Sequence, residues 1–428
     1  MSGAGPDSGK HSLWTRVFAA VFAVHLLIGL AAPERWRSTR FGDYAPQVEN
    51  LQAGRGFVAE DGSVMHRYPP LYPLMLWGLD RVARGTGAAL DMVLAGFAAI
   101  CNAVTAAGVA AMAARLGAGS AGIGFAAALF ALQPWVLYGL FLPLSETPFM
   151  AVLMAAILCL SAAARGEGRG GVAWAAAGGA LTGMACLIRP IAFLAPAVFG
   201  VVFLRKAQGA VLRRTVLAGA VVVAAAAVLL PWELLVWQRT GEWIPISSGG
   251  PPTLRDGLSF NHKSFRAPIA LPSGVRRVSD AAWREYESLE STGAYLRFLT
   301  RQALADPAAV VQTFVYKAAR AWYGTDAQRA RVEVFNGVVS LAFLTIVARG
   351  AWRLARRPGG SGAEAWLLFG ATGLLWAMAT VALSIARYMT PAVALLAPVA
   401  GAGWQRGIVE AGGEALEARG EGRGNRGI

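Results

Sequence analysis

A single carboxylate follows the first long apolar run of the chain. Asp43 lies about ten residues beyond the end of that run, in a polar segment. A carboxylate held at a membrane–water interface can act as the general base for a hydroxyl group. The alternative is a solvated loop acid or a helix N-cap, a position that Asp favours. Neither the residue type nor the neighbouring sequence favours one of these two interpretations over the other.

Basic side chains precede a pair of prolines farther along the same segment, in the sequence His66-Arg67-Tyr68-Pro69-Pro70. Prolines suit the first turn of a helix, and cations beside a helix N-terminus can bind phosphate. The alternatives are an Arg67 that snorkels to the interface and a His66 that is an ordinary surface histidine. No second histidine stands at metal-ligand spacing, so we predict no cofactor and find no support for a divalent metal.

Two arginines lie between apolar runs with almost no loop around them, Arg189 before Pro190 and Arg387 before Tyr388. Tight outer loops disfavour arginine, so two of them directed at one leaflet indicate an anion, and a lipid phosphate fits. The alternative is a structural ion pair with Glu146 or Glu233.

Glu146 follows Ser145 at the predicted outer end of another run. Ionisable residues at membrane depth are rare and usually functional. The competing interpretation is an interfacial helix start with Ser145 as its N-cap.

The composition identifies the elements that must position these residues. Of 428 residues, 56% are hydrophobic and 15% are charged, against about 25% charged in soluble domains. This excludes a cytosolic enzyme, a disordered chain and a secreted disulfide scaffold. The net charge of +14 could indicate nucleic-acid binding, but with this hydropathy topology signals and anionic lipid explain it better. We therefore predict a polytopic membrane protein and no nucleic-acid partner.

We predict an all-α fold with about ten transmembrane helices. The predicted spans are residues 14–32, 88–113, 121–138, 147–164, 171–188, 191–204, 216–237, 334–347, 365–385 and 391–404. The apolar run at 69–79 would be only ~16 Å long as a helix, too short to span, so we predict a juxtamembrane or re-entrant helix.

Arginine-rich short loops assign the two sides of the membrane by the positive-inside rule. With these loops and both termini in the cytoplasm, the polar mass lies outside, where we expect the chemistry. The predicted parts are a cytoplasmic tail (1–13), an N-terminal transmembrane module (14–237) with the first extracytoplasmic loop (33–87), an extracytoplasmic loop with amphipathic helices at 280–305 and 307–322 (238–331), C-terminal transmembrane helices (332–405) and a cytoplasmic tail (406–428).

Taken together, these features resemble the integral-membrane glycosyltransferases of the GT-C class. The likeness is nearest to the protein-mannosyltransferase and aminoarabinose-transferase-like branch, including the rhizobial Rgt-type enzymes. It rests on ordered pieces: Asp43-Tyr44, Asn50-Leu51-x-x-Gly54-x-Gly56-Phe57, Pro69-Pro70-Leu71-Tyr72-Pro73, Ser145-Glu146, Arg189-Pro190, Pro231-Trp232 with Gly241, and Arg387-Tyr388 before Pro391.

The resemblance implies the GT-C fold, with Asp43 as the catalytic base and a polyprenyl-phosphate-linked sugar as donor. It departs from the family in two places. Tyr68 stands directly before the prolines where some members have a basic residue, and Arg67 is our choice for that role. Tyr44 stands where a second acid often follows the first, which argues against a paired-carboxylate metal site.

We therefore expect an inverting glycosyltransferase in the cytoplasmic (inner) membrane, acting on an extracytoplasmic glycan, lipid or protein. The expected donor-phosphate residues are Arg67, Arg189, Arg387 and Tyr388, and the expected sugar, acceptor or supporting residues are Tyr44, His66, Tyr68 and Glu146.

Two other classes of function stay open. A transporter or flippase of lipid-linked saccharides would share the outer arginines but should carry charges at mid-span, where the sequence has almost none. A non-catalytic membrane protein of envelope assembly would need neither Asp43 nor clustered outer arginines.

Overall fold

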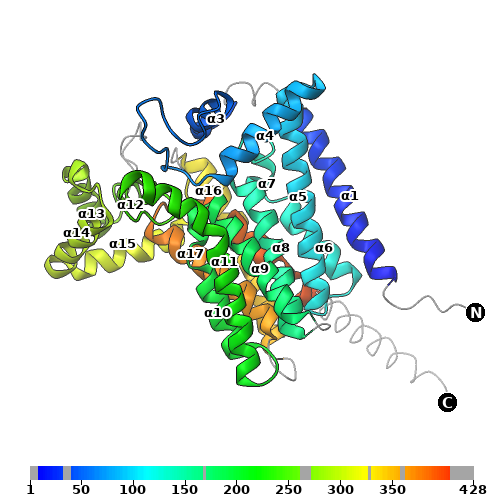
Figure 1. Cartoon of the computed structure of the whole chain (residues 1–428). Coiled ribbons are helices and arrows are strands. Elements are labelled where there is room, and N and C mark those ends of the chain that lie inside the picture. The colour runs from blue at the N-terminus through cyan, green and yellow to red at the C-terminus, as the bar shows by residue number, and fades with distance from the viewer. Residues whose placement is uncertain are drawn as a thin grey trace, which may run out of the picture.

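The computed structural model describes residues 8–31, 40–166, 170–260, 271–325, 329–356 and 362–404. Within these ranges the regular elements are helices, and the only strand-like pairing is one bridge between Val58 and Val64. Long helices form a bundle, with shorter helices at its top and at one side (Figure 1). The predicted tail 406–428 and most of 1–13 fall outside the described residues.

Seven described helices are long and apolar enough to cross a membrane. They are α1 (Ser8–Leu30), α5 (Leu90–Arg115), α8 (Glu146–Arg165), α9 (Gly171–Ile188), α11 (Val211–Thr240), α16 (Ala330–Ala355) and α17 (Ala363–Val381). The predicted all-α, multi-pass architecture is confirmed.

The other three predicted spans are shorter helices. Residues 121–138 divide into α6 (Ser120–Ala131) and α7 (Pro134–Tyr138), because the Gln133 side chain caps a new helix with proline at its start. α10 (Ala195–Lys206) has 12 residues, and a last helix covers 390–404. The count of about ten spans therefore stays a prediction.

Short helices follow α1 at the top of the bundle. The 3-10 turn η1 (Gly42–Tyr44) leads into α3 (Ala45–Gln52), and α4 (Leu71–Thr86) begins after the proline pair, as predicted. α4 extends beyond the apolar run because it is amphipathic, and Gly87 ends it in a left-handed conformation. It is not among the candidate spans.

The segment after α11 forms a separate group of helices beside the bundle (Figure 1): α12 (Gly250–Leu258), α13 (Ser273–Arg284), α14 (Thr292–Ala305) and α15 (Pro307–Arg320). The predicted continuous helix at 280–305 is wrong. The chain leaves α13 after Arg284, and Ser291 caps a new helix by accepting a hydrogen bond from the Ala294 amide. Asp306 starts α15 in the same way through the Ala309 amide, as the Asp-Pro pair predicts.

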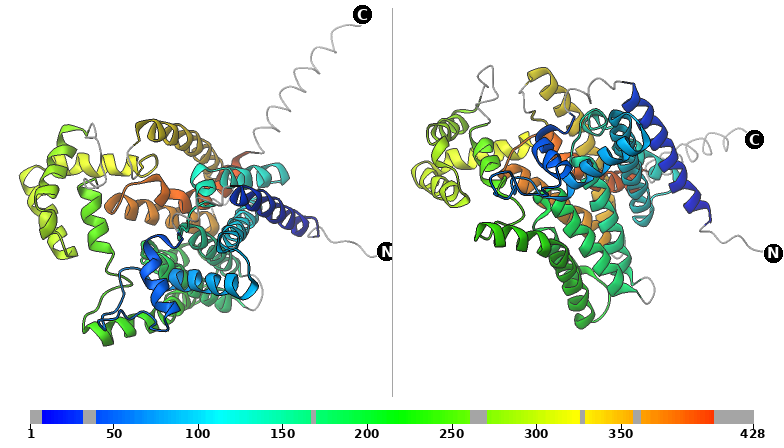
Figure 2. Two further views of the ribbon diagram at one scale, coloured as in Figure 1. Left: turned by 90° about the horizontal axis from the view of Figure 1, so that it is seen from above. Right: turned by 45° about the horizontal axis from the view of Figure 1, so that its top comes forward.

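Close helix packing brings α9 between α8 and α11 (Figures 1 and 2). A Cβ added at Gly179 of α9 would lie 2.3 Å from the backbone oxygen of Val221 in α11. Small residues let membrane helices approach closely enough for backbone contact. Because α9 ends at Ile188, this contact also fixes the position of Arg189.

We expect Gly179→Ala to destabilise the bundle by about 1–3 kcal/mol, the usual effect of overpacking. Gly219→Ala on α11 is the matched control, since a Cβ there meets no atom within 4 Å. Thermal unfolding of the detergent-solubilised protein measures the difference. Equal melting temperatures for the two variants would contradict the close α9–α11 contact.

Candidate active site

One buried carboxylate joins two of the predicted arginines. Glu146, the first residue of α8, is 4% exposed. Its Oε2 lies 2.8 Å from Nη1 of Arg189, which directly follows α9, and its Oε1 lies 3.1 Å from Nε of Arg387 in η5 (Ala386–Met389). Two guanidinium groups thus share one carboxylate, and the three side chains together carry a formal charge of +1.

Tyr388 packs against both guanidinium groups. Its ring centroid lies 4.9 Å from Cζ of Arg189 and 5.5 Å from Cζ of Arg387. A tyrosine ring attracts cations through its quadrupole, so Tyr388 helps to hold both guanidinium groups in place. Of the site predicted from the sequence, the structure therefore brings together Glu146 and the residues of both arginine loops.

The hydroxyl of Ser145 connects this cluster to the first loop. Ser145 Oγ accepts hydrogen bonds from Arg189 Nη1 at 2.9 Å and from the Tyr44 hydroxyl at 3.0 Å. Ser145 occupies the N-cap position of α8, but its side chain makes no capping bond. The N-cap interpretation is therefore wrong for the hydroxyl, which holds Arg189 and Tyr44 instead.

Two further tyrosines pack against the Tyr44 ring in tilted and edge-to-face arrangements. The Tyr44 ring lies 4.9 Å from the ring of Tyr68 and 4.8 Å from that of Tyr72. Burial raises the pKa of Tyr44 to about 12, so its hydroxyl stays protonated at neutral pH and serves as a donor.

Asp43 lies in η1 directly before Tyr44, and its side chain is exposed. Its charge reaches the Tyr68 hydroxyl: burial raises the pKa of Tyr68, and the Asp43 carboxylate raises it further. The guanidinium of Arg67, 5.6 Å from the Tyr68 ring centroid, opposes this effect. Tyr68 packs against Tyr44, whose hydroxyl binds Ser145, so Asp43 and Arg67 lie next to residues that contact the cluster.

The backbone of His66 connects the first loop to the segment that follows α11. Its carbonyl accepts a hydrogen bond from the Ser248 amide at 2.9 Å. Beside it, a Cβ added at Gly249 would lie 2.7 Å from the Arg67 carbonyl oxygen, so this approach needs glycine. The buried Nδ1 of His66 has no hydrogen-bond partner, and the imidazole is not part of the arginine cluster.

Glu233, the other predicted partner for the arginines, has a different role. Its Oε1 accepts a hydrogen bond from the Ile246 amide at 2.7 Å. Ile246 has a φ of 59°, a conformation that a β-branched residue adopts rarely. Glu233 therefore holds a strained turn after α11.

Sequence reasoning missed a buried lysine that positions Arg387. Nζ of Lys317, in α15, donates to the carbonyls of Gly257, Val381 and Ala382 at 3.0, 3.0 and 2.8 Å. Burial, together with a smaller effect of the neighbouring Arg320, lowers the pKa of Lys317 to about 7. An amphipathic pattern places such a lysine on the polar face, so its burial cannot be read from the local sequence.

Arg320, one turn after Lys317, binds the same connection. Its Nη1 donates to the Ser384 carbonyl at 2.8 Å, and its Nη2 contacts Glu333 at 2.8 Å. The Ala386 amide then donates to the Gly324 carbonyl at 2.8 Å. The segment between α17 and Arg387 is thus tied to α15 at several points.

The site and a second group of arginines lie at opposite ends of the bundle. α8 runs 20 residues from Glu146 to Arg165, about 30 Å of helix, which is the thickness of a bilayer core. Arg165 pairs with Glu364 at 2.5 Å and donates to the Arg115 carbonyl at 2.8 Å. Three arginines of the predicted cytoplasmic loops, Arg115, Arg165 and Arg213, gather there.

The site combines two guanidinium groups in positive excess with a carboxylate and tyrosine hydroxyls at its border, a composition that suits an anion. Within the described ranges, no group of three His, Cys, Asp or Glu side chains could hold a metal ion.

No protein-family model and no curated protein matches this chain. The chain does match solved structures in fold. With the apo oligosaccharyltransferase of Archaeoglobus fulgidus it shares a TM-score of 0.56 and 14% identity, over 96% of this chain and 52% of the other. With the same organism's oligosaccharyltransferase AglB in complex with an inhibitory peptide and a dolichol-phosphate, the TM-score is 0.50 at 12% identity, over the same shares.

A further match is ArnT from Cupriavidus metallidurans bound to undecaprenyl phosphate, with a TM-score of 0.41, 17% identity, and coverage of 90% of this chain and 77% of the other. That TM-score is too low to support an argument. The chain spans about half the length of the archaeal enzyme. The predicted resemblance to the GT-C glycosyltransferases is confirmed at the level of the fold.

Removing the charge of Glu146 should strongly destabilise the protein. Glu146→Gln leaves Arg189 and Arg387 facing each other without a buried counter-charge, and breaking such a pair costs about 3–5 kcal/mol. Glu60→Gln is the control, because Glu60 is 82% exposed and pairs with Arg55 at the surface, where a pair contributes at most about 1 kcal/mol. Thermal unfolding in detergent compares them, and an unchanged melting temperature for Glu146→Gln would contradict the shared carboxylate.

Lys317 should make stability depend on pH. Because the folded state lowers its pKa to about 7, the unfolded chain binds more protons between that pH and the ordinary lysine value of about 10.4. The wild type should therefore gain stability relative to Lys317→Met as pH rises from about 7 to about 10. Unfolding in detergent over this range measures the difference, with exposed Lys206→Met as control. A constant difference between wild type and Lys317→Met would overturn the assignment.

Proposed function

We propose that the protein transfers a sugar from a polyprenyl-phosphate-linked donor to an extracytoplasmic acceptor, with inversion at the anomeric carbon. The observation that carries this proposal is the convergence of Arg189 and Arg387 on the buried Glu146, beside the loop that bears Asp43. The GT-C fold supports a membrane glycosyltransferase as the class of enzyme.

The arginine cluster binds the donor phosphate. Its net charge of +1 favours an anion, and Tyr388 holds both guanidinium groups in place from one side. Preorganised donors stabilise the charge that develops on the lipid phosphate as the glycosidic bond breaks. Arg67, at the Tyr68 border of the cluster, adds a further positive charge for the same phosphate.

Asp43 acts as the general base. Its carboxylate takes the proton of the acceptor hydroxyl while that oxygen attacks the anomeric carbon from the face opposite the phosphate. The bond from carbon to phosphate oxygen breaks, and its electron pair leaves with the lipid phosphate. Tyr44 and Tyr68, whose hydroxyls stay protonated, orient the sugar or the acceptor. Holding both substrates in line supplies much of the acceleration.

The structural likeness supports a lipid-linked donor for this chain. The archaeal oligosaccharyltransferase of the same fold was solved with a dolichol-phosphate and an inhibitory peptide. In the proposed orientation, the end of the bundle with Arg115, Arg165 and Arg213 faces the cytoplasm, and the arginine cluster faces the outer leaflet of the cytoplasmic membrane. The acceptor is then an envelope glycan, lipid or protein.

Asp43→Asn should abolish transfer while the protein still accumulates in the membrane and binds donor. A general base contributes about 10²–10⁴-fold, so we expect a loss of at least about 100-fold. The measurement is mass spectrometry of envelope glycans and lipid-linked sugars in a deletion strain complemented with each variant. The deletion strain should accumulate donor and lack one sugar on the acceptor.

The control is Asp61→Asn in the same loop, an exposed acid that accepts hydrogen bonds from Ser63. That variant should restore the missing sugar as the wild type does. Full restoration of the missing sugar by Asp43→Asn would contradict the proposed mechanism. Unchanged envelope glycans in the deletion strain would contradict the proposed activity itself.

A further inference from the structure

A cavity lies beside the turn that carries Asp43. It has a volume of about 410 Å³ and opens between α3 and the C-terminal part of α4. The residues of α3 that line it, Ala45, Glu49 and Gln52, recur at helical spacing and so share one face. Gly42, the residue directly before Asp43, also lines the cavity.

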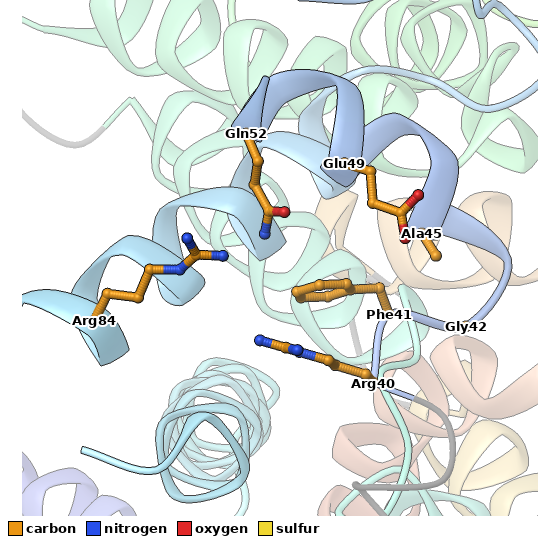
Figure 3. Close-up of a pocket in the computed structure, with 7 residues that line it drawn as sticks. All are labelled: Arg40, Phe41, Gly42, Ala45, Glu49, Gln52 and Arg84. Atoms are coloured by element: carbon orange, nitrogen blue, oxygen red, sulfur yellow. The ribbon is translucent and has the colours of Figure 1, made fainter. Parts of the chain in front are cut away.

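A buried carboxylate organises one end of this cavity. Asp80 of α4 is 2% exposed, and its Oδ2 accepts from Arg84 Nε and from Gln52 Nε2, each at 2.8 Å. Its Oδ1 lies 3.4 Å from Nη2 of Arg40. Figure 3 shows the ends of Arg40, Arg84 and Gln52 directed toward one another.

The arginines at this end are held in place but remain open to a ligand. Their side chains are 61% and 63% exposed, for Arg40 and Arg84 respectively, although both contact the buried Asp80. Arg84 contacts Asp80 through Nε, and its planar guanidinium fork is directed into the cavity in Figure 3. Two guanidinium groups against one carboxylate give this end a formal charge of +1, and such forks match phosphate and carboxylate.

The far side of the cavity has the opposite character. The Glu49 carboxylate lies away from the two guanidinium groups in Figure 3, toward Ala45. A carboxylate accepts hydrogen bonds from hydroxyl or amine groups. The cavity therefore fits a molecule with an anionic group at one end and hydroxyl or amine donors at the other, as in a phosphorylated or carboxylated sugar.

We propose that this cavity binds the phosphate or carboxylate group of the acceptor and so brings an acceptor hydroxyl to Asp43. The inference rests on the proposed function, because it takes Asp43 as the base. It adds the chemical class of the acceptor, an anionic glycan or glycolipid headgroup. The donor then binds the arginines at Glu146, and the acceptor binds the arginines at Asp80. Each pair of arginines is positioned by its own buried carboxylate.

Binding of an anionic lipid probe tests the cavity without any transfer reaction. The protein is placed in phosphatidylcholine nanodiscs and titrated with a fluorescent short-chain phosphatidic acid, or with the matching neutral diacylglycerol. We expect the wild type to prefer the phosphate probe and Arg40→Gln to weaken its binding about tenfold, the effect of losing one charge-assisted contact. Arg40→Gln keeps the shorter Arg84–Asp80 contact, so the fold is preserved.

Arg81→Gln is the matched control. Arg81 is an exposed arginine of the same helix, packed over the Trp77 ring and outside the lining of the cavity. It should bind the phosphate probe as the wild type does. Equal binding by wild type and Arg40→Gln, or a wild type without preference for phosphate, would overturn the anion site.

A second measurement separates acceptor from bulk phospholipid. In membrane vesicles, Arg40→Gln should raise the acceptor concentration needed for half-maximal transfer about tenfold and leave the dependence on donor unchanged. Short-chain phosphatidic acid should compete with the acceptor. Binding of the probe without such competition would assign the cavity to bulk phospholipid and overturn the acceptor role. Asp43→Asn should keep full probe binding, so failure of the proposed catalysis is distinguishable from failure of the cavity.

Discussion

The carboxylate of Glu146, in the first turn of the spanning helix α8, is buried in the protein interior. A buried carboxylate is tolerated only when it is paired and hydrogen-bonded. Here the pairing comes from Arg189 and Arg387, which follow two other spanning helices. The ends of α8, α9 and α17 are therefore held together by electrostatics that no single helix could satisfy, and the cationic site exists because one carboxylate is shared by two guanidinium groups.

That arrangement requires each arginine to arrive at a fixed depth. For Arg189 the depth is set by contact between glycines of α9 and the backbone of α11. For Arg387 it is set by Lys317 and Arg320, whose side chains bind the carbonyls at the end of α17 and in the connection that follows. The helices beside the bundle thus position a residue of the site from outside it.

The first loop contacts this frame at separate points. The Tyr44 hydroxyl donates to Ser145, the Ser248 amide donates to the His66 carbonyl, and the Phe57 ring packs edge-on against Trp232 of α11. Asp43 itself stays exposed at the border of the cluster. In the proposed mechanism, a base that meets an external acceptor needs this openness, whereas arginines that bind a phosphate gain strength from burial in a low dielectric. The exposed loop thus carries the candidate base, and the bundle carries the buried arginines.

Composition and hydropathy by themselves determined the membrane class and the helical fold, because long continuous apolar runs satisfy their own backbone hydrogen bonds in lipid as helices. Local signals also predicted particular starts, at the proline pair before α4 and at Asp306 before α15. Patterns failed where capping competes with periodicity, as at Ser291, which divides the predicted helix at 280–305.

The candidate arginines and Glu146 were predicted from their residue types and from their places at the ends of apolar runs. The sequence offered Glu146 or Glu233 as an ion-pair partner of the arginines but could not choose between them, because an ion pair between residues far apart in sequence leaves no local trace. Only the tertiary structure decided that Glu146 rather than Glu233 meets the arginines, that Ser145 binds Arg189 instead of capping α8, and that Lys317 is buried. Each of these follows from which helix ends meet, and helix packing sets that through close contacts between distant segments.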